Sequence, residues 1–399
     1  MDFYRHLFTR KATGLPVSFA LIYVFSVVFT FQTLLTAYSS STYLEQFVTP
    51  KWVGLIFAIS AAGALVLSLL LPRILRALGN VHTTLLLMIL ISLSLVCIGL
   101  GASPLITVIA FIIFLILNPQ IYLNIDIFLE TLTGTNEDTT GRTRGLILTV
   151  MSVAAFFAPL VMGYIIGAEN NLTAVYNVGA VVGLICIALL ISRFRHFYDP
   201  VYTTVRVRDM LTATLKNVNV RTVIATQFFL QFFYAWAIIY IPLYLAREVG
   251  FSWDVISTIL ASGLLAFILF EYPIGILADR KYGEKEMMAL GFVILALASA
   301  SISFMAGTGV LGWMLLMFLS RIGASLVEVT TESYFFKHVD GKEANLISLF
   351  RLTRPLANLI GALVGSLALL FLPFNLIFVV LALIMASGVF ITSLLTDTK

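Results

Sequence analysis

The sequence predicts an all-α polytopic membrane protein with twelve transmembrane helices in two pseudo-symmetric six-helix bundles. Three observations predict it: the composition, a series of long apolar runs, and a repeat that relates the two halves. Of the 399 residues, 60% are hydrophobic and only 11% are charged, whereas soluble domains carry about 25% charged residues. The apolar runs are continuous, unlike the short alternating segments of a membrane β-barrel.

The apolar runs are long enough to cross a bilayer, because a spanning helix needs roughly 20 mostly apolar residues. One long polar connection, residues 193–221, divides them into two sets. We therefore expect a first bundle over residues 1–192, a cytoplasmic central loop over 193–221 and a second bundle over 222–399. The runs are centred near Phe29, Ala62, Leu93, Phe114, Phe156, Leu184, Ala235, Leu264, Leu297, Ser320, Ala357 and Ile384.

The distribution of basic residues predicts the orientation. Most of the 24 lysines and arginines fall on one side of the membrane if the N-terminus is cytoplasmic, and cytoplasmic loops carry such an excess. We expect a multi-pass protein of the cell (plasma or inner) membrane with both termini cytoplasmic. This excess explains the basic charge without a nucleic-acid partner.

Metal, cofactor and ATP chemistry have no support in the sequence. Cys97 and Cys186 lie within predicted spans, and the four histidines lie at or beyond span ends. A Gly-x-x-x-x-Gly-Lys-Ser/Thr loop does not occur. We therefore expect no metal, no cofactor and no enzymatic activity.

An internal repeat relates the two halves. The segment YLEQFVTPKW at 43–52 matches YLAREVGFSW at 244–253, with tyrosine and tryptophan at the same spacing. The pair Asp126 and Glu130 is matched, at a similar offset, by Glu328 and Glu332. Two parallel repeats of six helices are a known plan of membrane transporters.

One loop carries the most specific motif. The segment GILADRKYGEK at 275–285 resembles the loop signature Gly-x-Leu-x-Asp-Arg-x-Gly-x-Lys of the major facilitator superfamily, with one extra residue before the second glycine. The first-half counterpart, LPRILRALGN at 71–80, departs from it, since Leu75 stands where the aspartate belongs. A weaker match, AAFFAPLVMGYIIG at 154–167, resembles the Gly-Pro-rich signature of efflux branches.

The resemblance implies a secondary active transporter, a monomer in the lipid bilayer that works by alternating access. It also implies that spans one, four, seven and ten face a cavity between the bundles. The polar and aromatic candidates there are Tyr23, Gln32, Asn118, Tyr122, Asn124, Gln227, Gln231 and Tyr234. Each of these side chains, taken alone, more often serves ordinary helix packing than ligand contact.

Charged residues inside spans are costly and usually pair with one another. At 1.5 Å per residue, Glu328 and Arg354 lie at a similar depth, so acids and bases share a level. We expect one paired network for proton coupling, with a static bridge as the alternative. Its members are Glu328, Asp126, Arg321, Arg351, Arg354 and Glu271. Glu328 is the preferred proton carrier, because burial favours the neutral form of a carboxyl group.

Shallower groups form the predicted cytoplasmic gate. Glu332 and Glu130 are expected to meet Arg280 and Arg76 of the nearby loops, with a passive surface pair as the alternative. The full predicted set is Gly275, Asp279, Arg280, Glu332, Glu130 and Arg76.

The function predicted from the sequence is proton-coupled transport of a small solute, with a lean toward efflux of amphipathic or drug-like compounds. Uptake of a sugar or other metabolite is the alternative within the same class. A polytopic membrane enzyme and a non-transporting sensor are the alternatives from other classes.

Overall fold

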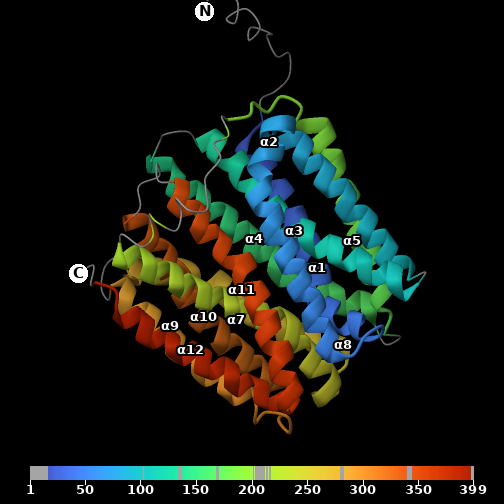
Figure 1. The fold of residues 1–399 in the computed structure, drawn as a ribbon, viewed down its shortest axis with the longest axis vertical. Coiled ribbons are helices and arrows are strands. Elements are labelled where there is room, and N and C mark those ends of the chain that lie inside the picture. Colours follow the sequence, from blue (N-terminus) through green and yellow to red (C-terminus); the bar gives the residue numbers. More distant parts are fainter. Residues whose placement is uncertain are drawn as a thin grey trace, which may run out of the picture.

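The protein consists of helices that form two bundles. The computed structural model describes residues 17–101, 103–133, 137–167, 170–200, 202, 212, 214, 217–278, 283–338 and 344–396. The first bundle comprises α1 (Phe19–Glu45), α2 (Pro50–Leu100), α3 (Pro104–Thr133), α4 (Glu137–Ile166) and α5 (Leu172–Arg193). The second comprises α7 (Val218–Tyr244), α8 (Trp253–Leu277), α9 (Glu284–Ile302), α10 (Val310–His338), α11 (Ala344–Phe371) and α12 (Ile377–Ser393). Figure 1 shows the blue-to-green bundle beside the yellow-to-red one.

Eleven helices in the described part of the chain are long and apolar enough to cross a membrane. The longest, α2, contains a non-helical break at Gly79, where φ is 76° and ψ is 167°. The break joins two segments that are each long enough for one crossing. The predicted number of twelve spans is reached when these segments are counted separately.

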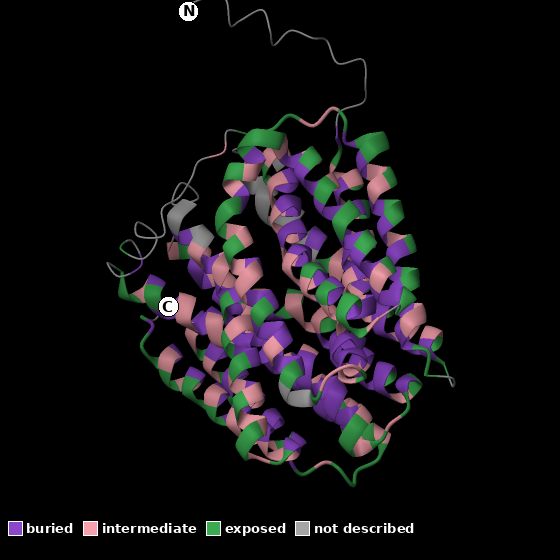
Figure 2. Ribbon diagram, turned by 45° about the vertical axis from the view of Figure 1, so that its right-hand side comes forward, coloured by how far each residue is buried: buried purple, intermediate pink, exposed green. Residues whose placement is uncertain are grey.

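The outer surfaces of the bundles suit contact with lipid. Figure 2 shows exposed residues on the outward faces of the helices and buried residues within the bundles. The exposed residues include large apolar side chains, such as Leu93, Leu184 and Leu383, each more than half exposed. In water such surfaces would favour aggregation, whereas a bilayer solvates them.

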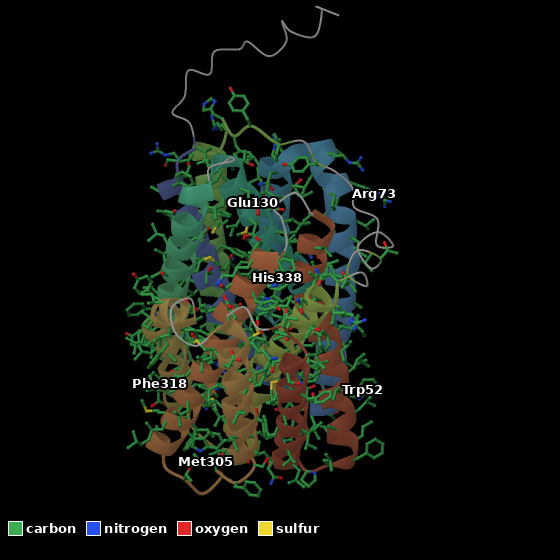
Figure 3. The ribbon with its side chains drawn as sticks, turned by 90° about the vertical axis from the view of Figure 1, so that its left-hand side faces the viewer. Trp52, Arg73, Glu130, Met305, Phe318 and His338 are labelled. Atoms are coloured by element: carbon green, nitrogen blue, oxygen red, sulfur yellow. The ribbon has the colours of Figure 1, made fainter. Side chains whose placement is uncertain are left out.

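The molecule has two ends that the helices connect. We call the end that holds the connection between α5 and α7 the linker end, and the other the distal end. Figure 3 shows Arg73 and Glu130 toward the linker end, and Trp52 and Met305 toward the distal end. The predicted orientation makes the linker end cytoplasmic.

At the linker end, Asp199 of the central connection binds the turn within α2. Its Oδ1 atom accepts hydrogen bonds from the backbone N–H of Asn80 at 2.6 Å and from the Tyr202 hydroxyl at 2.5 Å. Burial, followed by the hydrogen bond to Asp199, raises the pKa of Tyr202. A Cβ atom at Gly79 would overlap the Asp199 carboxylate, and the positive φ there also favours glycine. Asp199 therefore caps the start of the second α2 segment.

The two bundles contact each other through matching helices. Helix α2 packs against α11, α4 packs against α8, and α1 packs against α7. Under the repeat, α4 corresponds to α11, and the first segment of α2 corresponds to α8. The bundle interface therefore has an approximate two-fold relation, as the sequence repeat predicts.

Candidate functional site

A cavity of about 130 Å³ lies between the two bundles. Its wall is built from α1, the first segment of α2, α3, α7 and α11. The polar lining residues are Thr33, Ser40, Ser60, Asn118, Tyr122, Arg354 and Asn358. The apolar lining residues include Phe57, Phe114, Ile238 and Ile239. Both bundles therefore contribute to one amphipathic chamber.

The α3 side of the cavity is formed around a proline. Pro119 has no N–H, so the carbonyl of Leu115, one turn earlier, loses its usual helical donor. Both residues line the cavity. The adjacent Asn118 contacts α1, since its Nδ2 atom donates to Thr33 Oγ1 at 3.1 Å. These contacts present an amide, a hydroxyl and a backbone carbonyl at one wall.

On the α11 side, the cavity contains a positive charge. Arg354 is exposed and lines the cavity, although it lies well inside α11. Its guanidinium carbon is 5.2 Å from the ring centroid of Tyr122 on α3, which is cation–π geometry. This contact joins the bundles across the chamber.

Arg351 lies one turn nearer the linker end and contacts two acids. Its Nη1 atom is 3.4 Å from Glu332 Oε1 on α10, and its Nε atom is 3.8 Å from Asp126 Oδ2 on α3. All three side chains are about a third exposed. The structure thus brings together three of the predicted charges, and Asp126 connects them to the other bundle.

Glu328 makes a different contact. Its Oε2 atom accepts a hydrogen bond from the Tyr234 hydroxyl of α7 at 2.6 Å. Glu271 of α8 and Glu332 interact with it electrostatically. The carboxylate is half-buried inside the second bundle, and its hydrogen-bond partner is a neutral donor.

Arg321 occupies a third environment. It is buried, its guanidinium carbon is 5.1 Å from the Phe233 ring centroid, and it interacts with the Tyr38 hydroxyl of α1. Among the described residues it forms no ion pair. The single paired network predicted from the sequence is therefore divided into three parts, because aromatic rings and hydroxyl groups replace acids around Arg321 and Arg354.

Several predicted cavity residues lie elsewhere. Gln32 is fully buried and donates through Nε2 to the Gly179 carbonyl at 2.9 Å. Asn124 is fully buried and donates through Nδ2 to Thr84 Oγ1 at 3.0 Å. Inside an apolar bundle each amide needs a partner, and these partners lie within the first bundle rather than at the cavity.

Of the remaining cavity candidates, only Asn118 and Tyr122 line the chamber. Tyr23, Gln227 and Gln231 are not part of the lining, and Tyr234 instead contacts Glu328. The sequence prediction missed Asn358 as a lining residue. The helical spacing that places Asn358 four residues after Arg354 on α11 was the available signal.

The structure describes four of the six predicted gate residues. Asp279 and Arg280 lie outside the described residues. Arg76 is exposed and borders a separate recess with His82 and Asp199. Glu130 is exposed at the end of α3. A Cβ atom at Gly275 would meet Val329 at an ordinary 3.7 Å.

At the distal end, glycines allow helices of the two bundles to touch. A Cβ atom at Gly54 of α2 would overlap Ser366 Oγ of α11, and one at Gly163 of α4 would overlap Ser257 Oγ of α8. Gly54 of the first contact and Ser257 of the second lie the same number of positions apart in the sequence as Gly163 and Ser366 do. The two contacts are therefore related by the internal repeat.

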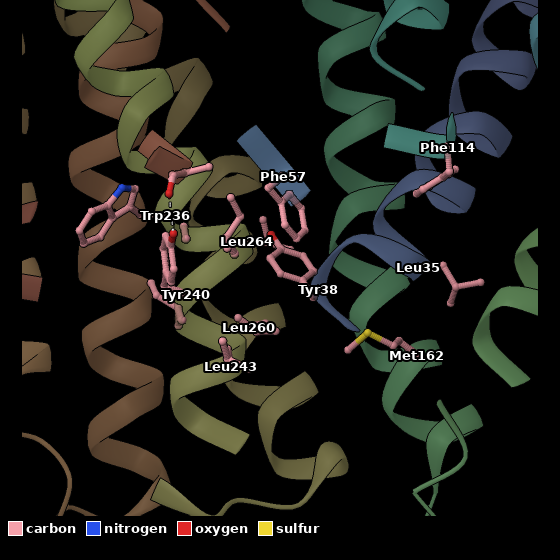
Figure 4. Close-up of a cluster of buried hydrophobic side chains, with 14 of the residues drawn as sticks. Leu35, Tyr38, Phe57, Phe114, Met162, Trp236, Tyr240, Leu243, Leu260 and Leu264 are labelled. Atoms are coloured by element: carbon pink, nitrogen blue, oxygen red, sulfur yellow. Dashed lines mark hydrogen bonds between the residues drawn. The ribbon is translucent and has the colours of Figure 1, made fainter. Parts of the chain in front are cut away.

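An aromatic layer adjoins these contacts. Tyr240 donates to the Ala362 carbonyl and Trp236 donates through Nε1 to the Gly361 carbonyl, each at 2.9 Å. Figure 4 shows both rings along α7, with Tyr38 and Phe57 of the first bundle nearby. Further out, Arg247 Nη1 lies 2.5 Å from Glu45 Oε1. The distal end is thus closed by packed side chains and one ion pair.

Comparison with known proteins agrees with this architecture. The model of the Major Facilitator Superfamily matches residues 223–399. The resemblance to the major facilitator superfamily is confirmed. A search of curated proteins found no match.

Solved structures of this fold extend the comparison over nearly the whole chain. The nucleoside transporter NupG matches with a TM-score of 0.70 at 15% identity, covering 94% of this chain and 100% of that one. A POT family transporter in complex with 5-aminolevulinic acid matches with a TM-score of 0.76 at 12% identity, covering 95% and 96%. Another, in complex with a thioalcohol-conjugated peptide, has a TM-score of 0.75 at 12% identity, covering 94% of each chain. At these identities the likeness shows the fold, and family and fold together point to a membrane transporter.

Proposed function

We propose that this chain is a proton-coupled secondary active transporter that moves a small solute by alternating access. The observation that carries the proposal is the pairing of an inter-bundle cavity with a carboxylate, Glu328, held by Tyr234 inside the membrane. An intramembrane acid is a functional candidate by default. The described residues include no group of three or more histidine, cysteine or acidic side chains placed to hold a metal.

The proposed cycle exchanges contacts at the two ends of the molecule. In the state described here, the distal end is closed by the Gly54–Ser366 and Gly163–Ser257 contacts. Separation of these contacts, with tighter closure around Arg351 at the linker end, would expose the cavity to the other side. Glu328 lies on α10 and is half-buried, and we infer that its proton exchanges with water from the linker end.

The comparisons bear on the class of solute. The similar structures are those of a nucleoside transporter and of POT family transporters in complex with a thioalcohol-conjugated peptide or with 5-aminolevulinic acid, and these compounds are small and polar or amphipathic. Efflux of drug-like compounds stays a prediction, as does the cytoplasmic position of the linker end. Uptake of a small metabolite is the alternative within the same mechanism.

Proteoliposomes test the coupling. Purified protein is reconstituted with a pH-sensitive dye inside, and nucleosides, dipeptides, monocarboxylates and sugars are added in turn under an imposed pH gradient. We expect a solute-dependent proton flux. Glu328→Gln is expected to abolish proton flux and gradient-driven accumulation while leaving exchange of labelled for unlabelled solute intact, because only the proton site is lost.

Glu286→Gln is the matched control, since Glu286 is exposed on α9. If Glu328→Gln keeps both accumulation and exchange, the carboxylate is only structural. If the wild-type protein moves solute with no proton flux, the coupling proposal fails. If it moves none of the solutes, the transport proposal fails.

A further inference from the structure

Arg354 differs from the other two arginines inside the membrane. Arg351 is bound by Glu332 and Asp126, and Arg321 is buried against Phe233 and Tyr38. Arg354 is exposed to the cavity, and its contact there is the face of the Tyr122 ring. Among the described residues, no carboxylate lies within ion-pair distance of it.

The geometry of this contact leaves donors available. A guanidinium carries five N–H groups in one plane. An aromatic ring that contacts the face of the guanidinium leaves its N–H edge open. This edge can bind a carboxylate through two parallel hydrogen bonds, in bidentate geometry. A cation within a membrane span is costly without a counter-charge. The cavity therefore offers a site for an anion.

The rest of the cavity sets the size and polarity of that anion. Phe57, Phe114, Ile238 and Ile239 form apolar walls, and Asn118 and Asn358 add amides near the charge. The volume of about 130 Å³ is close to that of an engineered cavity of about 150 Å³ that binds benzene. A single ring or a short chain fills such a space.

We propose that the cavity binds a small amphipathic monocarboxylate, with its carboxylate on Arg354 and its apolar part against Phe57 and Phe114. One guanidinium balances one negative charge, whereas a phosphate dianion would leave a second charge unmatched in a low-dielectric chamber. The binding site is argued from the cavity itself. Movement of the anion across the membrane rests on the transport function proposed above.

The same arrangement gives a physical basis for coupling to a proton. The charged and titratable groups that act on Glu328 are Tyr234 on α7, Glu271 on α8, Glu332 on α10, and Arg351 and Arg354 on α11. Ionised Glu328 lowers the positive potential at Arg354 and so opposes an incoming anion. Protonation of Glu328 removes that opposition, and by reciprocity anion binding favours the proton. Proton and monocarboxylate are therefore expected to move in the same direction.

Calorimetric titration of the purified full chain with benzoate and with uncharged benzamide tests the site. We expect saturable benzoate binding that exceeds benzamide binding by about tenfold or more. Arg354→Gln is expected to weaken benzoate binding by about tenfold while leaving benzamide unchanged, and Arg354→Lys to weaken it less, since the charge is kept and the paired donors are lost. Benzoate affinity is expected to rise as the pH falls from about 8 to about 6, while benzoate stays ionised, and to lose this dependence in Glu328→Gln.

Arg193→Gln, at the exposed end of α5, is the matched control for removal of one positive charge. Equal affinities for benzoate and benzamide, unchanged benzoate affinity in Arg354→Gln, or no saturable benzoate binding to the wild-type protein each overturn the proposal. If Arg354→Gln does not fold, the Arg354→Lys variant and the comparison with benzamide still decide whether Arg354 binds the carboxylate. Benzoate binding with no solute movement in the proteoliposomes refutes transport and leaves the anion site intact, so the two proposals fail separately.

Discussion

The two ends of the molecule hold the bundles together by different means. At the distal end, Gly54 and Gly163 let helices of opposite bundles touch serine side chains directly. At the linker end, the bundles meet through Arg351, whose contact with Asp126 is 3.8 Å long and open to water. The distal end is held by close packing, and the linker end by a long ionic contact.

This difference indicates which end separates more easily. Packed interiors are close to crystal density, so a helix contact without gaps resists small displacements. A half-exposed ion pair contributes little, because water and salt compete for both charges. The linker end is therefore the weaker of the two, and the distal end is the closed one in this state.

The largest expected effect comes from breaking the distal contact. Gly54→Leu would place a side chain where Ser366 Oγ and the Tyr240 hydroxyl now lie. Overpacking costs about 1–3 kcal/mol, which favours the state that is open at the distal end. We expect transport to fall about tenfold or more. Labelling of Ser60→Cys by a membrane-impermeant maleimide from the distal side should rise.

Gly307→Leu is the matched control, since nothing lies within 4 Å of a Cβ atom at that loop position. The labelling is done with Cys97 and Cys186 replaced by serine. Equal labelling in Gly54→Leu and in the control would show that this contact does not close the distal end.

An intermediate effect is expected at the linker end. Arg351→Gln removes the contacts to both Glu332 and Asp126 and leaves two carboxylates without their counter-charge. Because the three groups are about a third exposed, we expect a loss of about 1 kcal/mol after solvent screening. A thermal unfolding curve measures it. A variant as stable as the wild type would mean that the ionic contact does not hold the bundles together.

The smallest effect is expected from the ion pair at the distal end. Glu45→Gln removes the partner of Arg247, whose side chain is 47% exposed. Surface pairs of this kind contribute about 0–1 kcal/mol, so transport should change less than twofold. A loss comparable to that of Gly54→Leu would show that charge, rather than packing, closes this end.

The fold was accessible from the sequence because its determinants are local. Runs of apolar residues define the spans, and the repeat around Tyr43 and Tyr244 defines the two bundles. The break at Gly79 between two spans was likewise expected, because Gly79 lies in a loop motif. The sequence did not predict that the two spans would run on from one another with Gly79 as the one non-helical residue between them.

The site was less predictable because it depends on neighbours that are distant in sequence. The numbers of acids and bases inside the spans suggested that every arginine there pairs with a carboxylate. Aromatic rings instead contact Arg321 and Arg354, and spacing along one helix carries no information about these partners. Gln32 was assigned to the cavity by its span, but a carbonyl of α5 turns its side chain the other way.

Asp199 supplies the first-half loop with a carboxylate that the loop's own sequence lacks. The first-half loop has Leu75 in place of the expected acid, yet a carboxylate from the central connection, far along the chain, caps the turn beside it. A pattern search confined to that loop would score it as degenerate. Comparison of such chains by the atoms that surround the turn would find this carboxylate, and would include the beginning of the central connection in the first repeat.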